Sequence, residues 1–434
     1  MKPTALCTTL TLTMVLGLAC QRAPVAQPQA DILSLENGIR VVVLHVPGST
    51  SASIFTYLPM GLAGDGADEA QWSHLVEHLV LRTTIPVASQ EANAETLPDH
   101  MRLDFYGTTS NWEEGLSHHA QWLEGIPFTE GSLLAEKPAV KSECDHVARN
   151  LATHKFASAA WAQGYRFGRR HAAIKGDVDR ASLSGIQRYR DERLVVLDKT
   201  VVCIVGGLEV NTVRPIVTDR LGKITSEAKA PAPVQAPGGS RDMTWDLDAR
   251  HLVLTWPIPD VGADDYPALL VAGQLLMMRL FQDQELKALT GMALAGADLA
   301  TPQGTFFYVS ASLQPGASFE AVRGKLAQHV EAVRSDEQSA SQAPQFGRQL
   351  SEALTTMPDP AMLKAQAPPN MTQAMIEGNL GLQYAMHEYR YGSHRVAIAE
   401  ALAAITAGDV RQAAEQYLTP EEAAVCTLRP KPDT

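Results

Sequence analysis

The sequence is poor in cysteine, and its few cysteines do not suggest a disulfide framework. Five occur among 434 residues. Beyond Cys7 and Cys20 an odd number remains, with no short-range pairing pattern. Cys203 and Cys426 lie in short apolar runs that we expect to be buried strands, where a free thiol behaves as a small hydrophobic group. A small fold stapled by disulfides is therefore excluded.

Positive charge is also scarce. The chain has 36 lysines and arginines against 48 aspartates and glutamates, a formal net charge of -12. This charge repels phosphate backbones, and no stretch combines basic and aromatic residues as nucleic-acid surfaces do. We therefore expect no nucleic-acid partner. With 45% hydrophobic and 19% charged residues, the composition is that of a globular protein.

Long apolar runs are absent after the first twenty residues. Lys2 precedes a mostly apolar stretch at 5–19, the pattern of a secretory signal. The small residues before Cys20 resemble a bacterial lipoprotein cleavage site, although Gly17 replaces the usual leucine; a plain signal peptide is the alternative. We expect an exported protein on the periplasmic side of the cell envelope. Membrane attachment is expected only through a lipid on Cys20, which would anchor the chain to the outer membrane.

Length and element order predict two related domains. A chain of 434 residues is too long for one ordinary core, and the Pro- and Ala-rich residues 225–243 indicate a linker. We predict an α+β fold of two homologous domains, each a mostly antiparallel sheet packed against helices, enclosing a cleft. The predicted boundaries are a signal peptide at 1–20, a tether at 21–30, an N-terminal domain at 31–224, the linker, and a C-terminal domain at 244–434.

Hydrophobic periodicity places the elements within each half. An apolar stripe at helical spacing (Trp72, Leu75, Leu79 and Val80) predicts a helix from 68 to about 83. The other elements expected in the first half are strands at 38–44, 51–58, 101–106 and 200–205 and helices at 115–123, 131–153 and 210–221. In the second half we expect strands at 251–256, 304–313 and around Cys426, a helix at 264–281, and further helices up to 417.

Two histidines and a glutamate stand together on the predicted helix at 68–83. His74 and His78 are four residues apart, so their imidazoles project from one face and can bind one metal ion. This H-x-x-E-H order is the inverzincin motif. Glu77 lies beside them, where a carboxylate can accept a proton from water as the water attacks a peptide carbonyl. The pattern predicts a metallopeptidase site with one Zn²⁺ per chain.

A third protein ligand is expected elsewhere, because a catalytic zinc site usually takes three. Glu143 is the candidate, and Glu136 lies two helical turns before it on the same face of the predicted helix at 131–153. A solvated helix face is the commoner place for a glutamate, so the residues alone leave both readings open.

The sequence resembles the insulinase and pitrilysin family of zinc peptidases, which includes the mitochondrial processing peptidase. The resemblance covers most of the mature chain and is carried by the opening strand at 35–41, the glycine turn at 61–65 and the H-x-x-E-H helix. It implies that Glu143 is the third zinc ligand and that Glu136, seven positions earlier, is a second essential glutamate. The expected metal ligands are then His74, His78 and Glu143, and the expected catalytic residues are Glu77 and Glu136.

The second half departs from the family pattern. Active members usually carry an arginine and a tyrosine that clamp the substrate carbonyl, but the matching positions here read Lys287, Gly291 and Leu294. Leucine cannot donate a hydrogen bond to a developing oxyanion. The resemblance therefore implies a zinc-bearing endopeptidase subunit whose partner, a second family subunit, supplies the Arg/Tyr pair. A non-catalytic subunit that binds peptides or stabilises a partner is the alternative.

The resemblance also implies how substrate binds. An extended peptide or small protein would add as a strand to a sheet edge, which we expect near 103–109. The segment between His78 and Glu143 is shorter than is usual in the family, and we expect the shortening in a surface loop at 85–98. Cys144 is expected to pack, pointing away from Glu143, and the adjacent His118 and His119 are not expected to bind metal.

Overall fold

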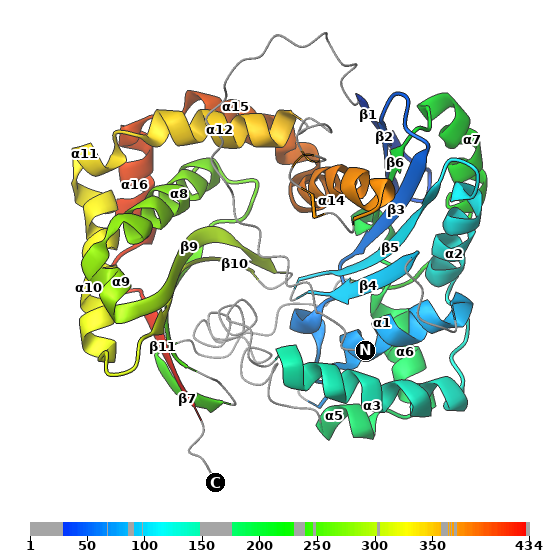
Figure 1. Ribbon diagram of the computed structural model, residues 1–434, viewed down its shortest axis with the longest axis horizontal. Coiled ribbons are helices and arrows are strands. Elements are labelled where there is room, and N and C mark those ends of the chain that lie inside the picture. Colours follow the sequence, from blue (N-terminus) through cyan, green and yellow to red (C-terminus); the bar gives the residue numbers. More distant parts are fainter. Residues whose placement is uncertain are drawn as a thin grey trace.

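The computed structural model describes residues 29–66, 68–85, 91–97, 99–147, 176–229, 239–245, 249–301, 304–356 and 371–430, together with 363, 365, 367 and 368. These residues form two β-sheets, which lie on opposite sides of the centre of the molecule (Figure 1). Helices cover the outer face of each sheet. The predicted fold class is confirmed.

Six strands form the first sheet, in the order β1-β2-β6-β3-β5-β4. Only β2 and β6 pair in parallel among these neighbours. The strands are β1 (Gln29–Ser34), β2 (Arg40–His45), β3 (Ser51–Leu58), β4 (Ala92–Thr96), β5 (Met101–Thr108) and β6 (Val201–Gly206). The central strands β3 and β6 are buried throughout, because side chains on both of their faces pack against helices.

Helices of the first half bury the outer face of this sheet. They are α1 (Trp72–Thr84), α2 (Trp112–Glu124), α3 (Glu130–Val147), α5 (Gly176–Arg180), α6 (Leu183–Arg193) and α7 (Val210–Arg220). One apolar core joins Ile54 of β3 and Leu103 of β5 to Leu75 and Leu79 of α1. This core fixes the face that α1 turns away from the sheet, toward α3.

Five strands form the second sheet, in the order β7-β11-β8-β10-β9. The strands are β7 (Arg241–Trp245), β8 (Arg250–Ile258), β9 (Thr290–Thr301), β10 (Gly304–Leu313) and β11 (Ala424–Pro430). The helices of this half are α8 (Tyr266–Gln282), α9 (Gln284–Leu289), α10 (Phe319–Ser335), α11 (Glu337–Ala340), α12 (Ala343–Thr355), α14 (Gln373–Tyr391), α15 (Arg395–Ala404) and α16 (Ala407–Tyr417). A second core lies between this sheet and α8, α10, α15 and α16.

One helix of the second half packs on the first sheet. In Figure 1, α14 lies on the inner face of that sheet, where it contacts β3 and β6. Leu380 belongs to the same buried cluster as Phe55 and Val205. Gly381 lets the helix lie close to the strand, because a Cβ there would be 2.6 Å from Cγ1 of Val205. This contact between the two halves was not predicted from the sequence.

Two buried carboxylates on α14 fix its position. Near the start of the helix, Glu377 accepts a hydrogen bond from Ser51 at the beginning of β3. Near its end, Glu388 accepts one from Arg40 of β2 at 2.5 Å. Both glutamates are less than 10% exposed, and loss of Arg40 would leave Glu388 as a buried, unpaired charge. The two halves are thus joined by apolar and ionic contacts.

Several expected elements agree with the structure and others do not. The strand predicted at 304–313 is β10, and the helix predicted at 131–153 is α3 as far as Val147, after which it leaves the described residues. The expected loop at 85–98 contains the strand β4, which the sequence analysis missed because its Ala, Asn and Glu residues are poor strand formers. β1 begins inside the predicted tether and β7 inside the predicted linker.

The predicted substrate edge is wrong. β5, which contains most of the stretch 103–109, pairs with β3 on one side and β4 on the other, so β4 is the edge strand at this end of the sheet. Cys203 and Cys426 are buried in β6 and β11, as predicted. None of the described helices is both long enough and apolar enough to span a membrane.

Truncation of Leu380 tests the contact between α14 and the first sheet. We expect Leu380→Ala to lower the free energy of unfolding by about 2–5 kcal/mol, because it leaves a cavity at a position that is 1% exposed. Leu134→Ala is the matched control on α3, where the side chain is 66% exposed, and it should change stability by less than about 0.5 kcal/mol. Urea denaturation measures both; equal losses would contradict the packing.

Candidate metal centre

Two helices bring the predicted ligands together. The apolar stripe of α1 turns Leu75 and Leu79 into the core, which leaves His74 and His78 on the side of the helix that contacts α3. α3 places Glu143 against both rings. Its carboxylate oxygen Oε2 lies 3.3 Å from Nε2 of His74 and 3.4 Å from Nε2 of His78.

The separations of Glu143 Oε2 from the two histidine nitrogens fit a tetrahedral zinc site. Zinc bonds to nitrogen and oxygen are about 2.0–2.2 Å long, so two ligand atoms at corners of a tetrahedron are about 3.3–3.6 Å apart. Both measured separations are close to the short end of this range. Among the described residues, His74, His78 and Glu143 are the one set of three such side chains whose ligand atoms converge. The donor set of two imidazoles and one carboxylate also suits zinc.

The other nitrogen of each ring has a partner of its own. Nδ1 of His78 lies 2.8 Å from Oε2 of Glu136, and Nδ1 of His74 lies 3.1 Å from Oε1 of Gln71. A partner that accepts the Nδ1 proton leaves the Nε2 lone pair free for a metal ion. The side chain of Glu136 is only 15% exposed and also lies 3.5 Å from Nε of Arg82. Glu136 is thus placed to orient the His78 ring, and it lies outside the set of converging side chains.

Charges in the cluster reinforce one another. Hydrogen bonds from His74 and His78 hold the pKa of Glu143 far below its usual range, although partial burial opposes this. Burial disfavours a charged His74 ring, but hydrogen bonds to Cys144 and Glu143 and the charge of Glu77 raise its pKa to about 10. The pKa of His78 is raised for similar reasons. A metal ion that bound here would displace protons from both rings.

Glu77 lies on α1 between the two histidines and is 7% exposed. Its charge acts on both rings, since it raises the pKa of each. The structure therefore places the expected base beside the expected ligands. The carboxylate of Glu77 is not one of the three groups whose ligand atoms converge.

Cys144 follows the expected ligand on α3. It is 4% exposed and belongs to the core, as predicted. Its thiol also acts to raise the pKa of the His74 ring, an influence not predicted from the sequence. Spacing along one helix relates Cys144 only to Glu143, whereas His74 lies on a different helix, α1.

The start of α1 is fixed by a buried carboxylate. Asp65 accepts hydrogen bonds from the backbone N–H groups of Gln71 at 2.8 Å and Ser73 at 3.1 Å, and from the hydroxyl of Tyr189 at 2.5 Å. Free N–H groups at a helix start favour a negative side chain. Asp65 is thus a cap for the helix that bears the histidines. No sequence signal revealed it, because it lies outside the short capping-box spacing.

The histidine pair outside the cluster has a structural role. His119 is fully buried, and its Nδ1 lies 2.7 Å from Oγ1 of Thr56. Burial and the neighbouring His118 lower the pKa of His119 to about 3, so the ring is neutral. The expectation that this pair binds no metal stays a prediction.

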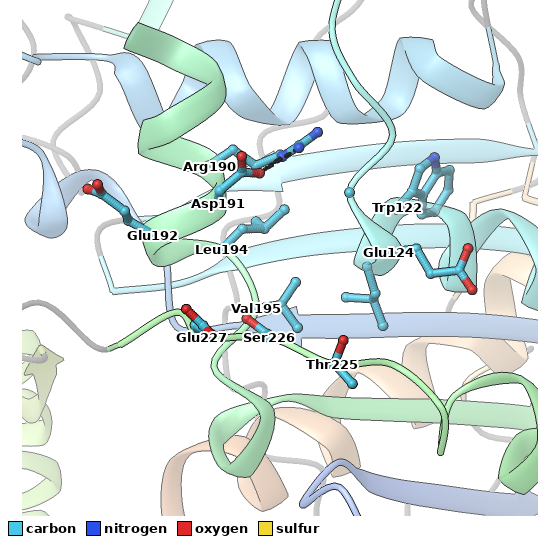
Figure 2. Close-up of a pocket in the computed structure, with 12 residues that line it drawn as sticks. Trp122, Glu124, Arg190, Asp191, Glu192, Leu194, Val195, Thr225, Ser226 and Glu227 are labelled. Carbon is cyan, nitrogen blue, oxygen red and sulfur yellow. Dashed lines mark hydrogen bonds and ion pairs between the residues drawn. The ribbon is translucent and has the colours of Figure 1, made fainter. Parts of the chain in front are cut away.

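A separate hollow of about 410 Å³ lies between the ends of α2 and α6 and the segment after α7 (Figure 2). Acidic residues line it, including Glu124, Glu192 and Glu227. Arg190 points into the same region, but its guanidinium is bonded to Asp191 and to the carbonyl of Ile126. None of the predicted metal ligands lines this hollow, so it is no part of the metal centre.

The second-half positions that differ from the family pattern lie apart from α1 and α3, the helices that carry the cluster. Lys287 is exposed on the short helix α9, and Leu294 is half-buried on β9, opposite Ser310 of β10. Leucine has no hydrogen-bond donor to offer an oxyanion, and lysine lacks the planar fork of arginine.

The fold is that of known two-domain peptidase-like structures. A protease from Helicobacter pylori superposes with a TM-score of 0.70 at 16% identity, over 93% of this chain and 100% of that one. A structure described as an M16-like peptidase, from Alicyclobacillus acidocaldarius, gives 0.68 at 14% identity, covering 93% and 99%. A peptidase M16 inactive domain from Pseudomonas fluorescens gives 0.67 at 14% identity, covering 94% and 99%.

The sequence comparisons agree with this class. The profile described as "Peptidase M16 inactive domain" matches residues 192–341, which include Lys287 and Leu294 but none of the predicted metal ligands. No curated protein sequence matches the chain. The matched segment is thus similar to a domain of the M16 peptidases, and the chain shares the fold of the three solved structures.

Titration of Asp65 tests the cap on α1. Burial raises the pKa of Asp65 to about 7 from 3.8, although hydrogen bonds from Tyr189 and Ser73 oppose this. Because the folded state binds the proton more tightly than the unfolded state, the stability from Asp65 is greatest below about pH 4 and is lost as the pH rises toward 7. We expect wild type to lose stability relative to Asp65→Asn between about pH 4 and pH 7, measured by urea denaturation. Parallel pH profiles would contradict the raised pKa.

Proposed function

We propose that this protein is a zinc-dependent endopeptidase subunit of the M16 type that hydrolyses extended peptides. The observation that carries the proposal is the convergence of two imidazole nitrogens and one carboxylate oxygen at 3.3 and 3.4 Å. The partners on Nδ1 of each ring support it, because metal-binding histidines usually have such partners. By the sequence resemblance, such a subunit would parallel the zinc-bearing subunit of the mitochondrial processing peptidase.

The residues divide the work of peptide hydrolysis. His74, His78 and Glu143 would hold Zn²⁺, which when bound supplies Lewis acidity that activates water and polarises a peptide carbonyl. Glu136 accepts the Nδ1 proton of His78 and so keeps that ring oriented. Glu77 accepts a proton from the attacking water and donates it to the departing amine. Its low exposure keeps bulk water from competing for the carboxylate.

The substrate would add to β4. This strand is the edge of the first sheet, and α1, which carries the cluster, packs against it. Its outward backbone groups would pair with an extended peptide in the manner of β-augmentation. Glu95 on this strand is half exposed and pairs with Arg102 of β5, so the rim of the edge carries both charges. Backbone pairing would make recognition depend on an extended conformation more than on side chains.

The second half explains why we propose a subunit rather than a complete enzyme. Leu294 cannot donate to the developing oxyanion, and removal of one such donor commonly slows an enzyme by about 10²–10³. We therefore propose that a second family subunit supplies the Arg/Tyr pair. The lipid anchor on Cys20 and the periplasmic location are further proposals that rest on residues outside the described part of the chain. Substrates would then be peptides or small proteins of the cell envelope.

A non-catalytic role is the second candidate. The match to a domain described as inactive favours it, as do Lys287 and Leu294. That match begins at residue 192 and so does not include the cluster on α1 and α3. Such a subunit would bind peptides or stabilise a partner without cleaving.

Metal analysis separates the roles of ligand and base. We expect about one zinc per chain in the purified mature protein, lost in His74→Ala and kept in Glu77→Gln. His394→Ala, an exposed histidine, is the matched control and should keep the metal. Glu77→Gln should lower kcat for a fluorogenic peptide by about 10²–10⁴, because it removes the base. Zinc-free wild type after reconstitution would contradict the proposed site.

Reconstitution with a second chain tests the subunit proposal. We expect a related family subunit that carries arginine and tyrosine at the positions of Lys287 and Leu294 to raise peptide cleavage by about 10²–10³. A partner with phenylalanine in place of that tyrosine is the control and should give little increase. If the pair cleaves no faster than the single chain, and Glu77→Gln makes no difference, the non-catalytic candidate replaces ours.

A further inference from the structure

Gln71 has a backbone conformation that is unusual for its side chain. At φ +70° and ψ +11° it is in the left-handed region, and it is the one non-glycine residue with positive φ among those the structure describes. This region suits glycine, because a Cβ crowds the neighbouring backbone. The conformation is held by Asp65, which accepts the Gln71 N–H at 2.8 Å. It allows the chain to turn sharply into α1.

The turn itself needs no glutamine. Any residue other than proline would offer the same N–H to Asp65, and glycine would do so with less crowding. What glutamine adds is its side chain, which is buried at 5% exposure. Its Oε1 lies 3.1 Å from Nδ1 of His74, one turn along the helix. Strain kept at a position where a simpler residue would fit is a sign of function.

We propose that Gln71 is a positioning residue for the metal centre, with its side-chain oxygen accepting the Nδ1 proton of His74 so that Nε2 faces the metal ion. This inference rests on the proposed function, because it assumes that the cluster binds zinc. It pairs Gln71 with Glu136, which has the same relation to His78. Each ring then has its own acceptor, one from the turn before α1 and one from α3.

The two acceptors differ in charge, because Gln71 is a neutral amide and Glu136 is a carboxylate. Glu77, Glu136 and Glu143 already bring three carboxylates to the two rings. A fourth at position 71 would add negative charge beside His74. The neutral amide fixes the tautomer and orientation of His74 without that charge. A neutral acceptor at position 71 therefore limits the negative charge around the site.

Three substitutions at position 71 separate the side chain from the backbone. Gln71→Gly removes the acceptor and relieves the crowding, Gln71→Met keeps the length but removes the acceptor, and Gln71→Glu keeps an acceptor of the same shape. We expect zinc affinity, measured by competition with a chelator, to fall about 10–100-fold in the Gly and Met variants and to stay near wild type in Gln71→Glu. The thermal unfolding temperature of the zinc-free Gly variant should not fall below that of wild type.

A merely structural role would give a different pattern. It predicts that zinc affinity changes only in parallel with the unfolding temperature, and wild-type affinity in the folded Met or Gly variant would overturn the proposal. Should the Gly variant fail to fold, the Met and Glu pair decides, because both keep a side chain of similar length. If wild type itself binds no zinc, the proposed function and this inference both fail; if wild type binds and all three variants bind equally, only this inference fails.

Discussion

The approach of α3 to α1 is the contact on which the rest of the site depends. It brings one carboxylate oxygen within 3.4 Å of two imidazole nitrogens, and neither helix alone supplies a complete ligand set. α1 is held by its apolar stripe in the first core and by Asp65 at its start. α3 is held by Leu133, Val140 and Cys144 in the same core. A small shift of either helix would break the tetrahedral spacing, because ligand atoms must lie within a few tenths of an ångström of their ideal positions.

The second half contributes support to the first sheet more visibly than it contributes chemistry. α14 buries the inner face of that sheet, with Leu380 and Gly381 packed against it and Glu377 and Glu388 bonded to its strands. β5 and α1 share the core on the opposite face, so the scaffold that positions the cluster is made partly from the other half of the chain. Loss of the second half would therefore be expected to disturb the metal centre even without any direct contact.

The sequence predicted what local periodicity controls. The stripe Leu75, Leu79 and Val80 identified α1, and the i, i+4 histidines followed from it. The assignment of Glu143 depended on the family resemblance, because the residues alone could not distinguish a metal ligand from a solvated glutamate. The structure brings that residue to the two histidines. Its assignment as a ligand stays a prediction until a metal is measured.

What the sequence could not predict comes from contacts between distant segments. β4 was missed because its composition is polar, and an edge strand needs only one partner to form. Gln71, Asp65 and Tyr189 form one assembly only after α6 has packed against α1. A left-handed glutamine also has no signature in a sequence, because glycine and asparagine are the residues that usually mark that conformation.

The cost of burying these charged side chains is easier to explain if the cluster binds a metal ion than if its role is only structural. His74, His78 and Glu136 have side chains that are 14%, 10% and 15% exposed, so their polar atoms are largely removed from water. Charged groups removed from water are costly even when they are paired, and well-packed apolar residues are often at least as stable in such places. A left-handed glutamine adds backbone strain to this cost. A metal ion would offset these costs, because the binding free energy of zinc contributes to the stability of the folded state. The absent Arg/Tyr pair bears on a different step, the stabilisation of the oxyanion, and a chain that binds zinc fully could still depend on a second subunit for catalysis.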